Sequence, residues 1–154
     1  MNYLQFFQEQ GYIPKISIPN YTAKQIARVL DKKLGLGRYK LFDAAVFLKE
    51  PHTDDYVSWH QDLEYWHKKY GNDVLTVWYA ITDSTYENGA LNVLAGSHKK
   101  RYKHIEIQDK NNVLSKGQKI DVAELDLSKR VVLELKAGEA SIHHGWLVHA
   151  SPPN

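Results

Sequence analysis

In residues 130–140, RVVLELKAGEA, the side chains at 130–136 are apolar on one face of an extended chain and mostly polar on the other face. Successive side chains of an extended strand point to opposite faces, so the alternation predicts a β-strand. One face of this strand carries Val131, Leu133 and Leu135, and the other carries Val132, Glu134 and Lys136. The KAG that follows predicts a turn of the chain.

Similar short apolar runs recur after Gly37, rich in Val, Ile, Tyr and Trp and separated by turn residues. This arrangement is typical of a β-barrel or a β-sandwich. We expect strands near residues 39–49, 56–61, 74–83, 91–95, 104–108, 131–135, 139–144 and 146–151.

Two of these regions carry further signals. TVWYAITD at 76–83 is apolar on both faces, which predicts a central strand covered on both sides. ENGALNVL places Asn88 and Gly89 between two strand-like segments, and this dipeptide predicts a hairpin turn.

One amphipathic helix is predicted over residues 22–34, where it serves as scaffold. Thr22 and Gln25 form a capping-box signature before the apolar positions, which recur at helical spacing. These positions are Ile26, Val29, Leu30 and Leu34.

The length of 154 residues fits one domain, with a helical N-terminal part at 1–38 and a β core at 39–154. Residues 109–128 are polar and weakly patterned. They indicate either an insertion or lid near a site, or an inert surface loop.

Composition excludes several classes of function. The formal charge is only +2, and HKKRYK at 98–103 fits a solvated loop better than a nucleic-acid patch. The absence of cysteine excludes disulfides, iron–sulfur clusters and thiolate zinc sites, so any metal must be held by nitrogen and oxygen. MNYLQFFQEQ lacks the features of a signal peptide, and no run of about 18 apolar residues occurs. We therefore expect a cytoplasmic protein with no nucleic-acid or membrane partner.

VSWHQDLEYWH at 57–67 holds the strongest candidate for chemistry. If 57–62 is a strand, His60 and Asp62 project from the same face and can offer one nitrogen and one oxygen to an ion. A third ligand is available near the other end, where SIHHGWLVHASPPN contains His143, His144 and His149. Two histidines and one carboxylate form the facial triad of non-heme Fe(II) oxygenases.

Two alternatives to this centre stay open on spacing alone. A His-x-Asp pair occurs by chance in many surface loops. Two histidines and a carboxylate also make hydrolytic zinc sites, although this chain lacks the H-E-x-x-H arrangement.

Three segments, in order and with sensible spacing, resemble the phytanoyl-CoA dioxygenase family of Fe(II)- and 2-oxoglutarate-dependent oxygenases. They are WHQD at 59–62, VLTVWYAITDSTYENGALNVLAGSHK at 74–99 and LKAGEASIHHGWLVHASPPN at 135–154. The resemblance implies a mainly β fold, a double-stranded β-helix (jelly-roll, cupin-like) with the N-terminal helix packed outside.

The same resemblance implies a dioxygenase that hydroxylates a C–H bond of a small-molecule substrate, with 2-oxoglutarate and O2 as co-substrates. Carried over by position, the ligands of Fe(II) are His60, Asp62 and His149. His143 and His144 then become neighbours of the metal rather than ligands.

Further residues match family positions. Trp78 corresponds to a position beside the co-substrate, although a plain core tryptophan is the alternative. Ser151 resembles the residue that hydrogen-bonds the far carboxylate of 2-oxoglutarate. His98 looks like a structural or outer-shell group, and the remaining histidines are expected to be solvated or locally hydrogen-bonded. These are His52, His67 and His104, of which His67 could line the pocket mouth.

One family feature has no match. Relatives anchor the far carboxylate with an arginine about ten residues beyond the distal histidine, where a guanidinium meets it with two hydrogen bonds. The arginines of this chain do not occupy that position; they are Arg28, Arg38, Arg101 and Arg130. We expect either a C-terminally incomplete jelly roll, or an anchor supplied by a lysine or a neighbouring chain.

A function of another class is a non-catalytic jelly-roll binding module or an inactive fragment, neither of which needs the triad. The sequence does not indicate the primary substrate or the oligomeric state.

Overall fold

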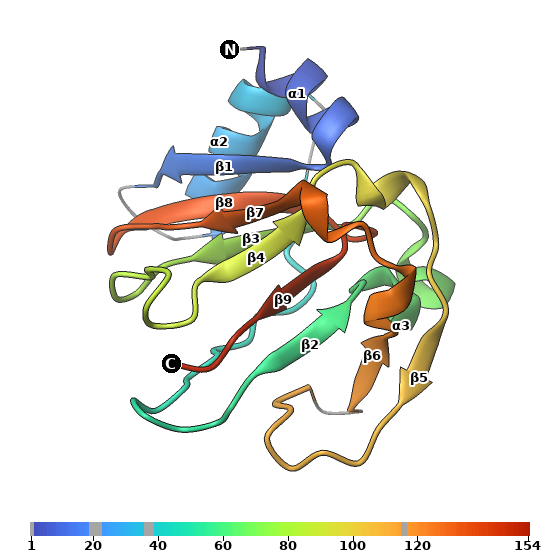
Figure 1. Cartoon of the computed structure of the whole chain (residues 1–154). Helices are drawn as coiled ribbons and strands as arrows, with labels where there is room; N and C mark the ends of the chain where they lie inside the picture. Colours follow the sequence, from blue (N-terminus) through green and yellow to red (C-terminus); the bar gives the residue numbers. More distant parts are fainter. Residues whose placement is uncertain (1, 19–22, 36–38, 115–116) are drawn as a thin grey trace.

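The computed structural model describes residues 2–18, 23–35, 39–114 and 117–154, which form mainly antiparallel β-sheet. One sheet has the order β1-β8-β3 and a second the order β2-β9-β4-β7, while β5 pairs with β6 (Figure 1). This is the expected jelly-roll class of fold. The strands are β1 Tyr12–Ser17, β2 Val57–His60, β3 Leu75–Tyr79, β4 Leu91–Leu94, β5 His104–Glu106, β6 Gln118–Ile120, β7 Arg130–Leu133, β8 Glu139–His144 and β9 His149–Ser151.

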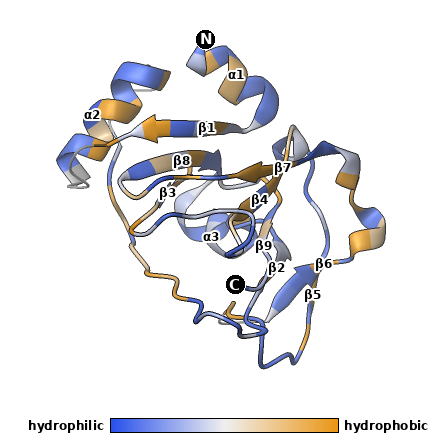
Figure 2. Cartoon of the chain, turned by 60° about the vertical axis from the view of Figure 1, so that its left-hand side comes forward, coloured by the Kyte–Doolittle hydropathy of each residue, from blue (hydrophilic) through white to orange (hydrophobic). Residues whose placement is uncertain are grey.

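Two N-terminal helices, α1 Tyr3–Gln10 and α2 Ala23–Leu34, cover the outer face of the sheet β1-β8-β3 (Figures 1 and 2). Leu30 and Leu34 of α2 are buried against β1 and β8, as the apolar spacing predicted. The predicted cap residue Thr22 lies outside the described residues.

Strand β1 was not predicted from the sequence, which suggested only helix in this part of the chain. Ile13 pairs with Ile142 of β8, and the register shifts between Ile13 and Ile16. Pro14 lies at this irregularity, and it hides the strand because proline cannot donate to a sheet ladder.

The strand predicted near 39–49 is wrong. Residues 39–50 form no helix or strand, and the side chains of Leu41, Val46 and Leu48 are exposed. Apolar β-branched and aromatic residues favour a strand only where a partner strand accepts their backbone hydrogen bonds. Figure 2 shows this apolar stretch running along the outside of the sheets after α2.

The predictions for 74–90 are also corrected. Strand β3 is shorter than expected and lies at the end of its sheet, with all five residues only half-buried. The hairpin at Asn88 and Gly89 is wrong, because β3 pairs with β8 whereas β4 pairs with β7 and β9. Asn88 and Gly89 instead form a turn on the connection between the two sheets.

Residues 109–128 contain an unpredicted strand, β6, and two short 3-10 turns at Val122–Glu124 and Leu127–Lys129. The hydroxyl of Ser58 on β2 donates to the backbone carbonyl of Gln118, and Asn112 Nδ2 donates to Ser58 Oγ at 3.1 Å. The inner part of this region is therefore docked onto β2.

The remaining helices are α3 Leu63–Tyr70 and a 3-10 turn at Ser97–Lys99. Figure 1 shows α3 close to the end of β2. Among the helices in the described part of the chain, none combines the length and apolar character needed to cross a bilayer.

A substitution tests the place of β1 in the core. Ile13 is fully buried between α2 and β8, so Ile13→Ala is expected to lower the free energy of unfolding by about 2–5 kcal/mol. Ile81→Ala is the matched control, because Ile81 is 70% exposed, and it should change stability by less than about 0.5 kcal/mol. Urea denaturation of both variants measures the difference; equal effects would contradict a buried β1.

Candidate metal centre

Two histidines face each other across the pair β2–β9. His60 is the last residue of β2 and lies opposite His149, the first residue of β9. Their ring centroids are 4.1 Å apart, and both side chains are buried. Antiparallel pairing thus brings together two side chains that are far apart in the sequence.

Asp62 reaches the same point by a route that the sequence did not predict. Strand β2 ends at His60, and Asp62 has helical backbone angles (φ −56°, ψ −43°) at the start of α3. The expectation that His60 and Asp62 share the face of one strand is therefore wrong. The turn nevertheless brings Asp62 Oδ1 to 3.3 Å from His60 Nε2 and 3.5 Å from His149 Nε2.

Gln61 holds this turn in place. Its buried side-chain amide donates to the carbonyls of Lys100 (2.8 Å) and Trp146 (2.6 Å), and its Oε1 accepts from the N–H of Tyr102 (2.9 Å). The backbone N–H of Gln61 donates to His104 Nε2 at 2.9 Å. His104, expected to be solvated or locally bonded, is thus a partner of the turn.

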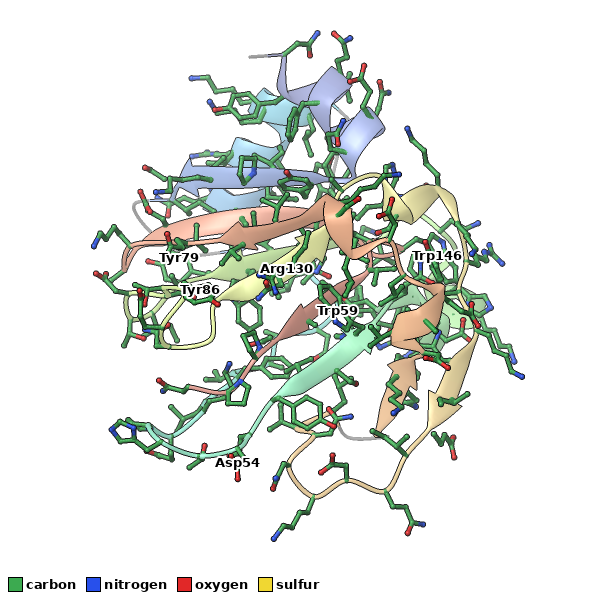
Figure 3. All side chains as sticks on the ribbon, in the orientation of Figure 1. Asp54, Trp59, Tyr79, Tyr86, Arg130 and Trp146 are labelled. Atoms are coloured by element: carbon green, nitrogen blue, oxygen red, sulfur yellow. The ribbon has the colours of Figure 1, made fainter. Side chains whose placement is uncertain are left out.

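The first turn of α3 is also tied to the connection between β8 and β9. The N–H of Leu63 donates to the carbonyl of Gly145 at 2.9 Å, and the N–H of Gly145 donates to the carbonyl of Val74 at 2.9 Å. A Cβ atom at position 145 would lie 2.6 Å from Leu63 Cγ, so the approach requires glycine. Figure 3 shows Trp146, which follows this glycine, beside α3.

Backbone carbonyls set the tautomers of both histidines. His60 Nδ1 lies 2.8 Å from the carbonyl oxygen of Ser58, and His149 Nδ1 lies 2.9 Å from that of Leu147. A carbonyl only accepts, so each Nδ1 carries a proton, and each ring turns its Nε2 toward Asp62. This is the orientation in which metal-bound histidines are usually held.

The pKa values of two groups of the centre are shifted by their surroundings. Burial alone would raise the pKa of Asp62, but His149, His143 and His60 together hold it well below its ordinary value. Burial is the main cause that lowers the pKa of His149 well below its ordinary value. Asp62 is therefore favoured as a carboxylate and His149 as an uncharged imidazole, which are the forms in which the two groups bind a metal ion.

The three groups fit a metal ion. One ligand atom from each of His60, Asp62 and His149 lies within 4.8 Å of the other two, and all three residues are buried. Two imidazole nitrogens and one carboxylate oxygen form the donor set of the facial triad, which suits Fe(II) and leaves other coordination positions open.

Thr76 on β3 was missed by the sequence analysis. Its hydroxyl donates to Asp62 Oδ2 at 2.7 Å, on the oxygen that points away from His60 and His149. Such a partner orients a metal-binding carboxylate. A threonine two residues before Trp78 gives no sequence signal for this role, because only the pairing of β3 with β8 brings it near Asp62.

His143 and His144 lie on opposite faces of β8. His143 is completely buried, with Nε2 3.4 Å from Asp62 Oδ2 and its ring 4.5 Å from that of His149. His144 turns to the other side, where its Nδ1 accepts from the N–H of Trp146 and burial lowers its pKa to about 4. Neither belongs to the three-residue group.

The remaining predicted positions fall around the centre. Ser151 lies two residues beyond His149 on β9 and is buried, as expected for a residue of the same face. Trp78 on β3 packs against the cluster that includes Leu91, and its ring lies 5.6 Å from that of Phe47. These contacts fit the alternative of a core tryptophan.

The other histidines are placed as local partners. His98 Nε2 donates to the carbonyl of Gln8 at 3.0 Å, and His67 Nδ1 donates to that of Leu63 at 2.7 Å. His52 is exposed on the connection before β2.

Sequence comparisons agree with this geometry. The phytanoyl-CoA dioxygenase (PhyH) family profile matches residues 7–154. A phytanoyl-CoA dioxygenase domain-containing protein 1 homolog from Dictyostelium discoideum is 34% identical over 127 residues, which are 79% of this chain and 43% of that protein. A probable alpha-ketoglutarate-dependent hypophosphite dioxygenase from Stutzerimonas stutzeri is 31% identical over 101 residues, 64% of this chain and 34% of its own length. The chain thus spans less than half the length of these relatives.

Solved structures show the same fold. The match to EvdO2 from Micromonospora carbonacea var. aurantiaca covers 99% of this chain and 83% of the EvdO2 chain. Its TM-score is 0.71 and the sequence identity is 16%. For EvdO2 complexed with 2-oxoglutarate, the match covers 69% of this chain and 42% of the EvdO2 chain, with a TM-score of 0.57 and 26% sequence identity. The match to the non-heme monooxygenase ThoJ covers 99% of this chain and 71% of ThoJ, with a TM-score of 0.64 and 20% sequence identity. With its triad, its fold and a profile match over nearly its whole length, the chain belongs to the phytanoyl-CoA dioxygenase (PhyH) family.

Proposed function

We propose that this chain is the core of an Fe(II)- and 2-oxoglutarate-dependent dioxygenase that hydroxylates a C–H bond of a small-molecule substrate. The observation that carries the proposal is the convergence of His60, Asp62 and His149 within 4.8 Å, with both Nε2 atoms directed at the carboxylate. EvdO2, a similar structure, is complexed with 2-oxoglutarate, and a second relative of this fold, SnoN, with Fe3+ and alpha ketoglutarate.

In this proposal the three residues hold Fe(II), which when bound supplies the activation of O2 that is coupled to decarboxylation of 2-oxoglutarate. The chain's own residues bind and orient. The backbone carbonyls of Ser58 and Leu147 keep the imidazoles in the binding tautomer, and Thr76 turns the carboxylate.

A carboxylate at position 62 also supports the proposed outcome. With Asp62 as the third protein ligand, its carboxylate occupies the coordination position of the metal that a halide ion would otherwise take. Hydroxylation is accordingly proposed in preference to halogenation. His143, buried beside Asp62, helps to exclude water from this side of the centre.

Removal of the carboxylate tests the ligand assignment. Asp62→Ala is expected to abolish stoichiometric Fe(II) binding and succinate formation from 2-oxoglutarate, because only two neutral ligands remain. Asp54→Ala is the control, since Asp54 is exposed on the connection before β2 (Figure 3). Anaerobic Fe(II) titration, followed by succinate assay in air, measures both effects. Full succinate formation by Asp62→Ala would refute the centre.

The hydrogen bond from Thr76 gives a second test. Thr76→Val keeps the shape but removes the donor to Asp62 Oδ2, and is expected to weaken metal binding by about 10–100-fold. Thr76→Ser keeps the hydroxyl and should retain affinity within about threefold of the unaltered chain. Competition with a metal chelator measures the affinities. Equal affinities of the valine and serine variants would show that the hydroxyl does not orient Asp62.

A further inference from the structure

His143 is a buried histidine that the three-residue centre leaves unused. It lies on β8, the middle strand of the sheet β1-β8-β3, and its side chain is completely buried. Neither Nδ1 nor Nε2 forms a hydrogen bond within the described part of the chain. A buried polar group without a partner destabilises a protein, whereas an apolar side chain would fill the same space without that cost.

One atom of the metal centre lies within reach of this ring. His143 Nε2 is 3.4 Å from Asp62 Oδ2, a separation that is long for a hydrogen bond. Hydrogen bonds at catalytic centres are often long before the ligands bind and shorten afterwards. Asp62 Oδ2 is therefore the acceptor available to His143.

Strand pairing fixes the ring on the side of Asp62. His143 lies opposite Tyr12 of β1 and opposite Thr76 of β3, so its backbone is held from both sides. Residues directly opposite each other on neighbouring strands place their side chains on the same face of the sheet. The hydroxyl of Thr76 already donates to Asp62 Oδ2 at 2.7 Å. A cross-strand pair thus directs two polar groups at one carboxylate oxygen.

The two oxygens of Asp62 have different surroundings. Oδ1 lies 3.3 Å from His60 Nε2 and 3.5 Å from His149 Nε2, on the side where the ligand atoms meet. Oδ2 faces Thr76 and His143 instead. A carboxylate oxygen can accept two hydrogen bonds, so these two donors together would saturate Oδ2. Only Oδ1 is then left for a metal ion.

We propose that His143 is a positioning residue, which donates from Nε2 to Asp62 Oδ2 and so makes Asp62 present Oδ1 alone to the metal ion. This inference rests on the proposed function and gives a role to a histidine outside the three ligands. Thr76 and His143 hold the carboxylate from two adjacent strands. An oxygen that is held in this way takes no further coordination position, and those positions stay open.

Substitutions of His143 separate its hydrogen bond from its bulk. The probe is Co2+, whose visible absorption reports its binding, in competition with a metal chelator. His143→Leu fills a similar volume without a donor and is expected to weaken Co2+ binding by about 10–100-fold. His143→Gln places an amide N–H near the position of Nε2 and should retain the affinity within about threefold.

The stability of the metal-free chain gives a readout that a structural role would not produce. His143→Leu removes an unpartnered buried polar group, so the urea midpoint of the metal-free chain is expected to stay unchanged or to rise while metal binding weakens. His143→Phe keeps a planar ring and removes the same donor. It is expected to bind Co2+ as weakly as His143→Leu, and it decides the question where the leucine variant does not fold.

Ser141→Ala is the matched control. Ser141 is completely buried two residues earlier on β8, and its Oγ also lacks a hydrogen-bond partner among the described residues. The substitution removes the same kind of group from the same strand without touching the contact between His143 and Asp62. It should leave the affinity for Co2+ unchanged.

The outcomes separate the two proposals. If the unaltered chain binds no Co2+, the proposed metal centre itself is overturned. If His143→Leu binds Co2+ as tightly as the unaltered chain, or His143→Gln binds it as weakly as His143→Leu, the role of His143 is overturned while the metal centre stands. Equal weakening by Ser141→Ala, or a lower metal-free midpoint in both the leucine and the glutamine variant, would also overturn it, because either result marks a structural effect of β8.

Discussion

The pairing of β2 with β9 is the interaction on which the metal centre depends. It places His60 opposite His149, and the turn after β2 then brings Asp62 between them. Each of the three groups turns a ligand atom toward the other two in a buried space. The surrounding structure must therefore hold the groups together, which Gln61 and Thr76 do through buried hydrogen bonds.

The sequence predicted the class of fold and the grouping of His60, Asp62 and His149 better than it predicted the geometry that unites them. Strand alternation was reliable in β7, where Leu133 is buried and Glu134 exposed, because one face meets the core and the other meets water. Apolar character misled at 39–49, which forms no strand, and it misplaced β3, which was expected to be central and lies at the end of its sheet, because it does not show which segments find a partner. Pro14 hid β1 for a related reason, since a bulge tolerates what a regular ladder does not.

For the site, the prediction of His60, Asp62 and His149 as neighbours was right for a wrong reason. The alternation of side chains along a strand placed His60 and Asp62 on one face of one strand, whereas a helical turn after β2 brings them together. Residues that act through tertiary contacts leave no local pattern. Thr76 becomes visible only when the strands are paired, because Asp62 lies 14 positions away in the sequence.

Gly145 constrains the site from outside the triad. Its bare Cα lets the connection between β8 and β9 touch Leu63, whose N–H donates to the carbonyl of Gly145 at the first turn of α3, next to Asp62. A Cβ at this position would lie 2.6 Å from Leu63 Cγ, so the side chain of Leu63 or α3 itself would have to shift. The seating of the carboxylate at the start of α3 therefore depends on the small size of one residue on a different connection.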